Sequence, residues 1–133
     1  MCYYVYLMSK AHNLRISREF HFDAAHHLTN YYGKCENPHG HTYRLEVVVE
    51  GPIGEDGLVI DFVVLKKMTK ERVLEKLDHK DLNEIFDNPS AENIAVWVWE
   101  QLHDIGAAAE RPVKLVEVKL WEGQNTAVIY AGN

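Results

Sequence analysis

The sequence predicts an α+β fold, in which strands both precede and follow a pair of helices. Apolar and polar side chains alternate over residues 14–26 and 39–50, as they do along strands with one buried face. Apolar positions then recur with helical spacing over 61–77 and 90–105, and two short strand-like stretches follow. This order differs from the regular βαβ alternation of a parallel sheet and therefore favours an α+β arrangement.

The first two predicted strands each have one face suited to a core. The first runs from Leu14 to about His26, and its single exception to the apolar parity is Arg18. The second runs from His39 to Glu50 and follows a loop over 29–34. The side chains that share its apolar face are His39, His41, Tyr43, Leu45, Val47 and Val49.

Both predicted helices begin at a capping residue. Asp61 follows a turn over 51–57 and is the expected N-cap of the first helix, and Ser90 is the expected N-cap of the second. Gly106 and Pro112 bracket the end of the second helix. The residues expected to face inward are Phe62, Leu65, Met68, Val73 and Leu77, then Ile94, Trp97, Val98, Leu102 and Ile105. Strands over about 113–122 and 126–130 complete the chain.

Composition limits the class of protein. A chain of 133 residues, 47% hydrophobic and 26% charged, fits one soluble domain, which we expect over residues 13–133 after an N-terminal extension over 1–12. No apolar run approaches the ~20 residues of a membrane span, and a net charge of −6 disfavours nucleic-acid and anionic-membrane surfaces. Cys2 and Cys35 form no disulfide framework, so a cytoplasmic location is expected.

Three histidines fall where strand geometry would bring them together. Residues i and i+2 of a strand point to the same side, so His39 and His41 share a face, and His26 lies on the apolar face of the preceding strand. If the two strands pair, the three imidazoles converge, which suits a catalytic zinc ion with a fourth position left open. A His-x-His pair alone is more often solvated or hydrogen-bonded, and that alternative stays open at this point.

Several short motifs follow one another along the chain. They are FDAAH (22–26), CENPHGH (35–41), GLVIDF (57–62), LDH (77–79), NPSAEN (88–93) and the later pair Glu122 and Tyr130. Together they resemble the 6-pyruvoyl-tetrahydropterin synthase family, which includes the 6-carboxytetrahydropterin synthases of queuosine biosynthesis. The resemblance implies a T-fold (tunnelling fold), with a four-stranded antiparallel sheet and two helices packed on one face. It also implies a homohexamer, a dimer of trimers with active sites at subunit interfaces.

The resemblance also assigns residues to a metal and a substrate. It implies that His26, His39 and His41 bind Zn²⁺ and that Glu122 holds the pterin ring. Glu122 shares the parity of the apolar positions Val116, Val118 and Leu120, where an unpaired carboxylate is costly. The guanidine-like edge of a pterin would pair with it through two hydrogen bonds. Ser90 is expected first as a helix cap and second as a substrate contact.

The catalytic residues implied by the resemblance are a base and its relay. Cys35 matches the catalytic cysteine, and Asp78 and His79 match the pair that completes the relay. A free thiol titrates near ~8.5, so a neighbouring base such as His79 would favour the reactive thiolate. Asp78 and His79 are neighbours in sequence, and we expect them to reach the site by separate paths.

The motif around Cys35 separates the reactions of the family. The short gap between Cys35 and His39 resembles the carboxytetrahydropterin type, which converts 7,8-dihydroneopterin triphosphate and releases acetaldehyde and triphosphate; this is the preferred function. Glu36 resembles the base of relatives that make 6-hydroxymethyl-dihydropterin for folate, which gives a dual-type alternative. The remaining alternatives are 6-pyruvoyl-tetrahydropterin synthase proper, a zinc-stabilised pterin-binding module without catalysis, and a hydrolase that uses zinc-bound water.

Overall fold

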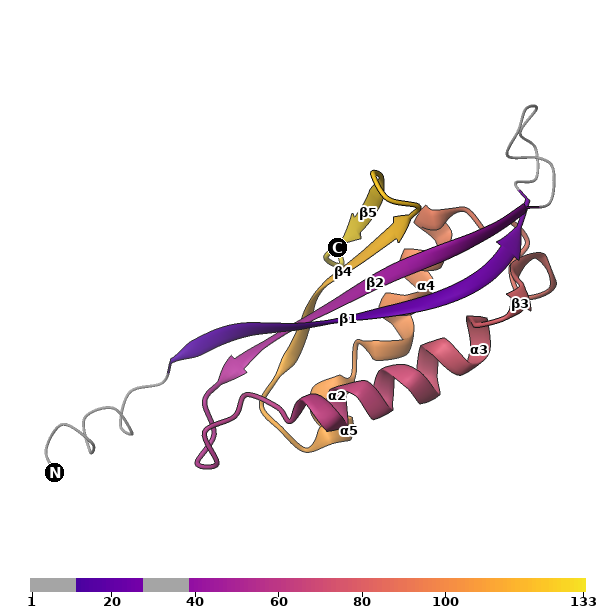
Figure 1. Cartoon of the computed structure of the whole chain (residues 1–133). Helices are drawn as coiled ribbons and strands as arrows, with labels where there is room; N and C mark the ends of the chain where they lie inside the picture. Colours follow the sequence, from indigo (N-terminus) through magenta and orange to yellow (C-terminus); the bar gives the residue numbers. More distant parts are fainter. Residues whose placement is uncertain (1–11, 28–38) are drawn as a thin grey trace, which may run out of the picture.

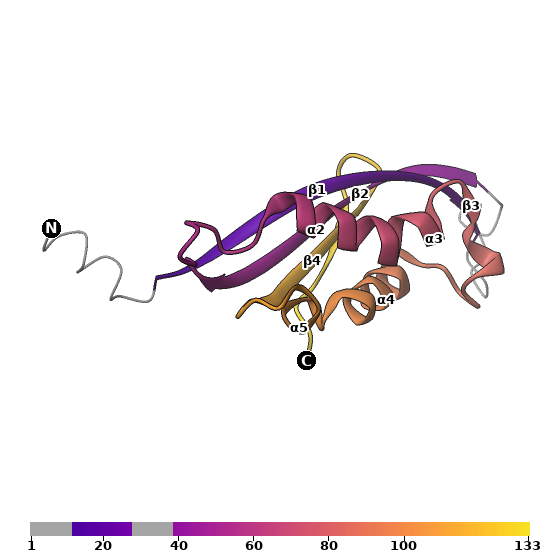
Figure 2. The same cartoon turned by 90° about the horizontal axis from the view of Figure 1, so that it is seen from below.

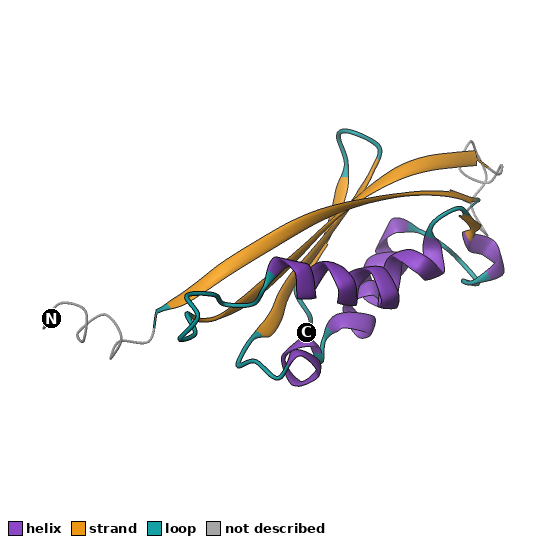
Figure 3. Ribbon diagram, turned by 60° about the horizontal axis from the view of Figure 1, so that its bottom comes forward, coloured by secondary structure: helices purple, strands orange, loops and turns teal. Residues whose placement is uncertain are grey.

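The computed structural model describes residues 12–27 and 39–133, except for the side chain of His39. It has two layers, a twisted sheet and a set of helices that cover one of its faces (Figures 1 to 3). The expected α+β class is therefore confirmed. Most of the proposed N-terminal extension and the loop that carries Cys35 and Glu36 lie outside the described residues.

Four strands of the sheet are the predicted antiparallel ones. The strands are β1 (Asn13–His26), β2 (His39–Pro52), β3 (Lys80–Asp81), β4 (Lys114–Glu122) and β5 (Ala127–Tyr130), in the spatial order β3-β1-β2-β4-β5. The additional strand, β3, pairs in parallel with β1 over two residues. A strand of two residues is too short to show an alternating pattern, so the sequence could not reveal it.

The register of the long strands gathers the polar residues of the buried face at one end. In the β1–β2 pair His26 lies opposite His39, and Ala24 lies opposite His41. In the β2–β4 pair Tyr43 lies opposite Glu122. Residues directly opposite each other in an antiparallel pair point to the same face. The side chains of His26, His41, Tyr43 and Glu122 therefore lie close together on the face of the sheet that the helices cover.

A bulge changes the parity of β4. The β2–β4 register shifts between Val48 and Val49, and each side chain on the far side of such a shift moves to the opposite face. Leu115 is consequently buried at 6% exposure, whereas Val116 is only half-buried. The prediction that Val116 shares the buried face of Val118 is wrong for this reason.

The first predicted helix is present but contains a wider turn. It comprises α2 (Phe62–Thr69), the π-helical turn η2 (Lys70–Leu74) and α3 (Glu75–Leu77), and Asp61 caps it by accepting a hydrogen bond of 2.8 Å from the Val63 N–H. The π turn keeps residues spaced by four on one stripe. The buried residues of that stripe are Leu65, Thr69, Val73 and Leu77.

The sequence predicted that Phe62 faces the core, but in the structure it does not. Its side chain is 47% exposed, and Val63 and Val64 beside it are exposed as well. The first turn of α2 thus lies at the margin of the core. Helical periodicity identifies a face, but it does not show where along the helix the packing begins.

The second predicted helix divides into α4 (Ala91–Leu102) and α5 (Ile105–Ala109). Gly106 lies inside α5, and the end of this helix falls between Gly106 and Pro112, as the sequence predicted. A Cβ atom at this position would lie 2.1 Å from the Val113 carbonyl oxygen, so the glycine permits the close approach of the following chain. The helix ends at Glu110, which has a left-handed φ of 55°.

The core lies between the sheet and the helices. Phe22, Leu45 and Leu120 from the sheet pack with Ile94 and Leu102 of α4 in one buried cluster. The 3-10 turn η3 (Leu82–Glu84) follows β3.

Among residues 12–27 and 39–133, no helix combines the length and the apolar character that a membrane span needs.

Candidate functional site

Two histidines and a carboxylate meet at the end of the sheet where β1 finishes and β2 begins. The Nε2 atom of His26 lies 3.8 Å from one carboxylate oxygen of Glu122, and the Nε2 atom of His41 lies 3.6 Å from the other. The two imidazole rings are 4.9 Å apart between centroids and tilted by 40°. His26 is buried, whereas His41 and Glu122 remain partly accessible.

This donor set fits a divalent metal ion. One donor atom from each of His26, His41 and Glu122 lies within 4.8 Å of the other two, and imidazole and carboxylate are both ligands of zinc. The backbone of His39 lies opposite His26 at the mouth of the same hairpin, although its side chain is outside the described part of the structure. The pairing of β1 with β2, on which convergence of the histidines depends, is present.

Tyr43 contacts the buried side chain of His26. Its hydroxyl oxygen is hydrogen-bonded to Nδ1 of His26, and its ring stacks on Phe22 with centroids 4.8 Å apart. Burial, with a further contribution from the negative charge of Glu122, raises the pKa of Tyr43 far above its usual value, so the group stays a neutral phenol. The sequence placed Tyr43 on the right face, but it gave no sign of this hydrogen bond.

A hollow of about 290 Å³ opens beside Glu122. It lies between the start of α4 and the β4–β5 connection. Its lining residues are Ala91, Glu92, Leu120, Glu122, Thr126, Ala127 and Val128. Glu92, in the first turn of α4, thus adds a second carboxylate to this hollow. A flat ligand with several N–H donors would match a cavity lined by two acids and apolar side chains.

Ser90 is a helix cap in this structure. Its Oγ accepts a hydrogen bond of 3.1 Å from the N–H of Asn93, while the side chain of Asn93 donates to the carbonyl of Asn88 at 2.8 Å. The first of these bonds satisfies one of the N–H groups that the beginning of a helix leaves unpaired. Ser90 is not among the residues that line the hollow beside Glu122.

Replacement of Ser90 separates its two proposed roles. Ser90→Ala should lower the free energy of unfolding by about 0.5–2 kcal/mol through loss of the cap, as measured by urea denaturation. Ser90→Asp keeps a capping oxygen and should restore most of that stability. If the hydroxyl also contacts substrate, both variants will show a raised KM; an unchanged KM in both would leave Ser90 with the capping role alone.

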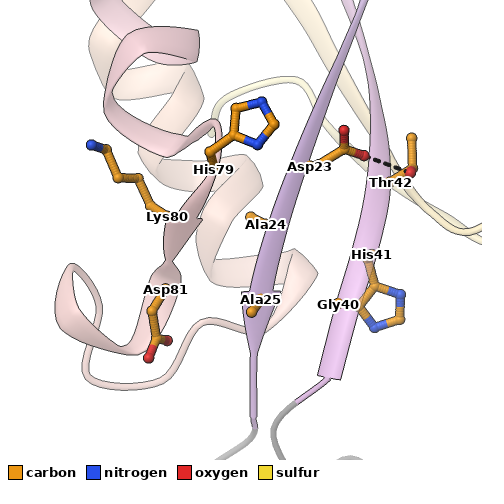
Figure 4. A pocket seen from close by; sticks show the side chains of 9 residues that line it. All are labelled: Asp23, Ala24, Ala25, Gly40, His41, Thr42, His79, Lys80 and Asp81. Carbon is orange, nitrogen blue, oxygen red and sulfur yellow. Dashed lines mark hydrogen bonds between the residues drawn. The ribbon is translucent and has the colours of Figure 1, made fainter.

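A second polar cluster lies at the β1 edge that faces β3. Asp78 accepts a hydrogen bond of 3.0 Å from the N–H of Asp23, and the N–H of His79 donates to the Asp23 carbonyl at 2.6 Å. Thr42 donates to the Asp23 carboxylate at 2.6 Å. Asp23, Thr42 and His79 border a shallow depression of about 560 Å³. Figure 4 shows the His79 ring on the β3 side of β1 and the His41 ring beyond β2.

Asp78 and His79 lie side by side, contrary to the expectation of separate paths. The Nε2 atom of His79 is 3.6 Å from a carboxylate oxygen of Asp78. His79 has a left-handed φ of 58°, a conformation that costs a non-glycine residue on the order of 1 kcal/mol. This turn at the end of α3 folds two sequence neighbours onto each other, which an extended chain would prevent.

Five of the predicted site residues fall into two groups. His26, His41 and Glu122 form one, and Asp78 and His79 join Asp23 in the other. Sequence reasoning did not single out Asp23, whose exposed side chain lies on the face opposite Ala24. The catalytic predictions for Cys35 and Glu36 concern residues outside the described ones.

Known proteins resemble this chain over almost its whole length. A family model described as 6-pyruvoyl tetrahydropterin synthase matches residues 15–133. A protein of Pyrococcus furiosus named dihydroneopterin monophosphate aldolase is 45% identical over 114 residues, which cover 86% of this chain and 94% of the relative. The 6-carboxy-5,6,7,8-tetrahydropterin synthase of Synechocystis sp. is 37% identical over 109 residues, covering 77% and 84%.

The fold agrees with these matches. The solved structure of the 6-pyruvoyl tetrahydropterin synthase of Caenorhabditis elegans superposes with a TM-score of 0.80 and 28% identity, covering 91% of this chain and 96% of that one. Its likeness extends over both the sheet and the helices that position the two polar clusters. The chain is a T-fold protein and belongs to the 6-pyruvoyl tetrahydropterin synthase family.

Proposed function

We propose that this protein is a zinc-dependent lyase that cleaves a carbon–carbon bond in the side chain of a phosphorylated 7,8-dihydroneopterin. The observation that carries the proposal is the approach of the His26 and His41 Nε2 atoms, at 3.8 and 3.6 Å, to one carboxylate in a member of this family. A hollow beside that carboxylate gives a ring-shaped ligand room to bind.

In the proposed site, different residues bind the metal ion and the pterin ring. His26, His39 and His41 hold the zinc ion, and Glu122 accepts hydrogen bonds from the amino-pyrimidine edge of the ring in the adjoining hollow. A zinc ion at this position supplies a Lewis acid for the hydroxyl groups of the substrate side chain. Glu122 would thereby fix the distance between the ring and the reacting carbons.

The proposed base is Cys35, assisted by His79 and Asp78. Asp78 orients the His79 ring at 3.6 Å, and the imidazole takes the thiol proton so that the thiolate can act. Within the described chain, this pair clusters with Asp23 rather than with the metal-binding histidines. The separation supports the further proposal that subunits of a homohexamer complete one another's sites.

Two products are in competition. The 6-carboxy-5,6,7,8-tetrahydropterin synthase of Synechocystis sp. supports the carboxylated product preferred from the Cys35 motif, made from the triphosphate with release of acetaldehyde and triphosphate for queuosine biosynthesis. The Pyrococcus furiosus aldolase, similar over nearly its whole length, favours the second candidate, 6-hydroxymethyl-dihydropterin. Glu36 beside Cys35 is the residue that the second reaction would use as its base.

Product analysis of two variants tests the proposal. Zinc-loaded protein is incubated with 7,8-dihydroneopterin triphosphate and, separately, with the monophosphate, and the pterin products are identified by mass. Cys35→Ala should lower the rate at which the carboxylated product forms, and Glu36→Ala should lower the rate at which the hydroxymethyl product forms. Each rate should fall by on the order of 100-fold or more, the range expected for loss of a general base. A product that keeps every side-chain carbon would contradict carbon–carbon cleavage.

A control addresses the non-catalytic alternative. Removal of a catalytic metal by a chelator should abolish turnover and leave the circular dichroism spectrum nearly unchanged, whereas removal of a structural metal should unfold the chain.

We further propose that residues 13–133 form one catalytic domain. The cytoplasm is the proposed compartment, because a thiol base requires a reducing environment.

A further inference from the structure

The imidazole of His26 has two nitrogens in different surroundings. Nε2 faces the Glu122 carboxylate at 3.8 Å, whereas Nδ1 faces the hydroxyl group of Tyr43. His26 is 2% exposed and Tyr43 is fully buried. The choice of which nitrogen carries the single proton of a neutral imidazole is therefore made inside the protein rather than by bulk water.

We propose that Tyr43 is a positioning residue for the metal site: its hydroxyl oxygen accepts a hydrogen bond from Nδ1–H of His26, which leaves the Nε2 lone pair directed at the ion. This inference rests on the proposed function, because it presupposes a zinc ion bound through Nε2. Metal-binding histidines commonly donate their second N–H to such a partner, which fixes both the tautomer and the ring orientation.

The surroundings of Tyr43 hold its hydroxyl in place. The ring stacks on Phe22 with an interplanar angle of 8°, and the two residues are register partners on β1 and β2. The ring also makes an edge contact with His41, with centroids 5.7 Å apart. Tyr43 therefore contacts both described histidines of the site, one through its hydroxyl group and one through its ring.

Tyr43→Phe isolates the hydrogen bond. The substitution keeps the ring on Phe22 and against His41 and removes only the acceptor for His26. We expect zinc affinity, measured by competition with a chromophoric chelator, to fall by about 10–100-fold. Tyr130→Phe is the matched control, since Tyr130 on β5 packs against Trp99 at 5.5 Å, away from the cluster, and its zinc affinity should equal that of the original protein.

Nitrogen-15 NMR of the histidine side chains gives a readout that altered packing would not move. In the zinc-loaded original protein, His26 should be the Nδ1–H tautomer with a proton that exchanges slowly with water. In Tyr43→Phe that proton should exchange faster and its resonance should shift upfield. The urea unfolding curve of the metal-free variant reports separately whether the fold is intact.

The outcomes distinguish this inference from the proposed function. If the original protein binds no stoichiometric zinc, the proposed function itself is wrong. If it binds zinc and Tyr43→Phe has the same affinity and the same protected proton, the role of Tyr43 is overturned. Should the variant not fold, the original protein still decides, because a zinc-loaded His26 that carries its proton on Nε2 would contradict the inference.

Discussion

His41→Ala should yield a folded protein that no longer holds a stoichiometric zinc ion and whose turnover falls by at least ~1,000-fold. Loss of a metal that stabilises developing charge removes several kcal/mol from catalysis, and each 1.36 kcal/mol corresponds to about tenfold in rate. The fold should survive, because the His41 side chain is 23% exposed and its loss leaves no closed cavity. His26, which is almost fully buried, would be a poorer choice.

The measurement combines metal analysis with kinetics. Zinc content is determined by mass spectrometry on untagged protein purified without chelators, and product formation is followed on the same samples. His103→Ala is the control, since His103 is an exposed residue at the end of α4 and should affect neither quantity. Full zinc occupancy in His41→Ala would remove His41 from the proposed ligand set.

Glu122→Gln should reduce kcat/KM by roughly 100-fold or more while the protein keeps its zinc. The carboxylate is proposed to accept two hydrogen bonds from the pterin edge, and a hydrogen bond to a charged group contributes about 1.5–3 kcal/mol. Glutamine presents one N–H₂ group where an acceptor is required, so a ring N–H would face another donor. The loss should therefore appear mainly in substrate affinity.

Zinc content decides between two roles for Glu122. Its carboxylate lies close enough to His26 and His41 to be a ligand itself, and the variant tests that directly. Glu117→Gln is the control. Glu117 lies on the same strand, β4, but it pairs with Val48, whereas Glu122 pairs with Tyr43 beside the histidines. If Glu122→Gln loses zinc together with activity, Glu122 belongs to the metal site and the proposed pterin contact is wrong.

Local patterns predicted most of the fold. Alternation gave β1 and β2 nearly to their ends, and the capping side chains of Asp61 and Ser90 marked the helix starts that the structure has. The features that escaped prediction depend on contacts between distant segments. The bulge near Val49 is set by the pairing of β2 with β4, and the glycine inside α5 is required by the carbonyl of Val113.

The site was predictable where strand periodicity alone decides the geometry. A period of two placed His26 and His41 on the buried face without knowledge of any distant contact. The meeting of Glu122 with these histidines depends on the β2–β4 register, which parity along one strand does not specify. The contact between Asp78 and His79 depends on a left-handed backbone angle that no residue type at these positions signals.

Anomalous diffraction from crystals of the zinc-loaded protein, recorded on both sides of the zinc absorption edge, tests the metal site most directly. One peak per chain should lie about 2.0–2.1 Å from a nitrogen of each of His26, His39 and His41, as in other zinc sites. A peak at the Asp23, Asp78 and His79 cluster instead, or no peak between the three imidazoles, would contradict the proposed metal centre.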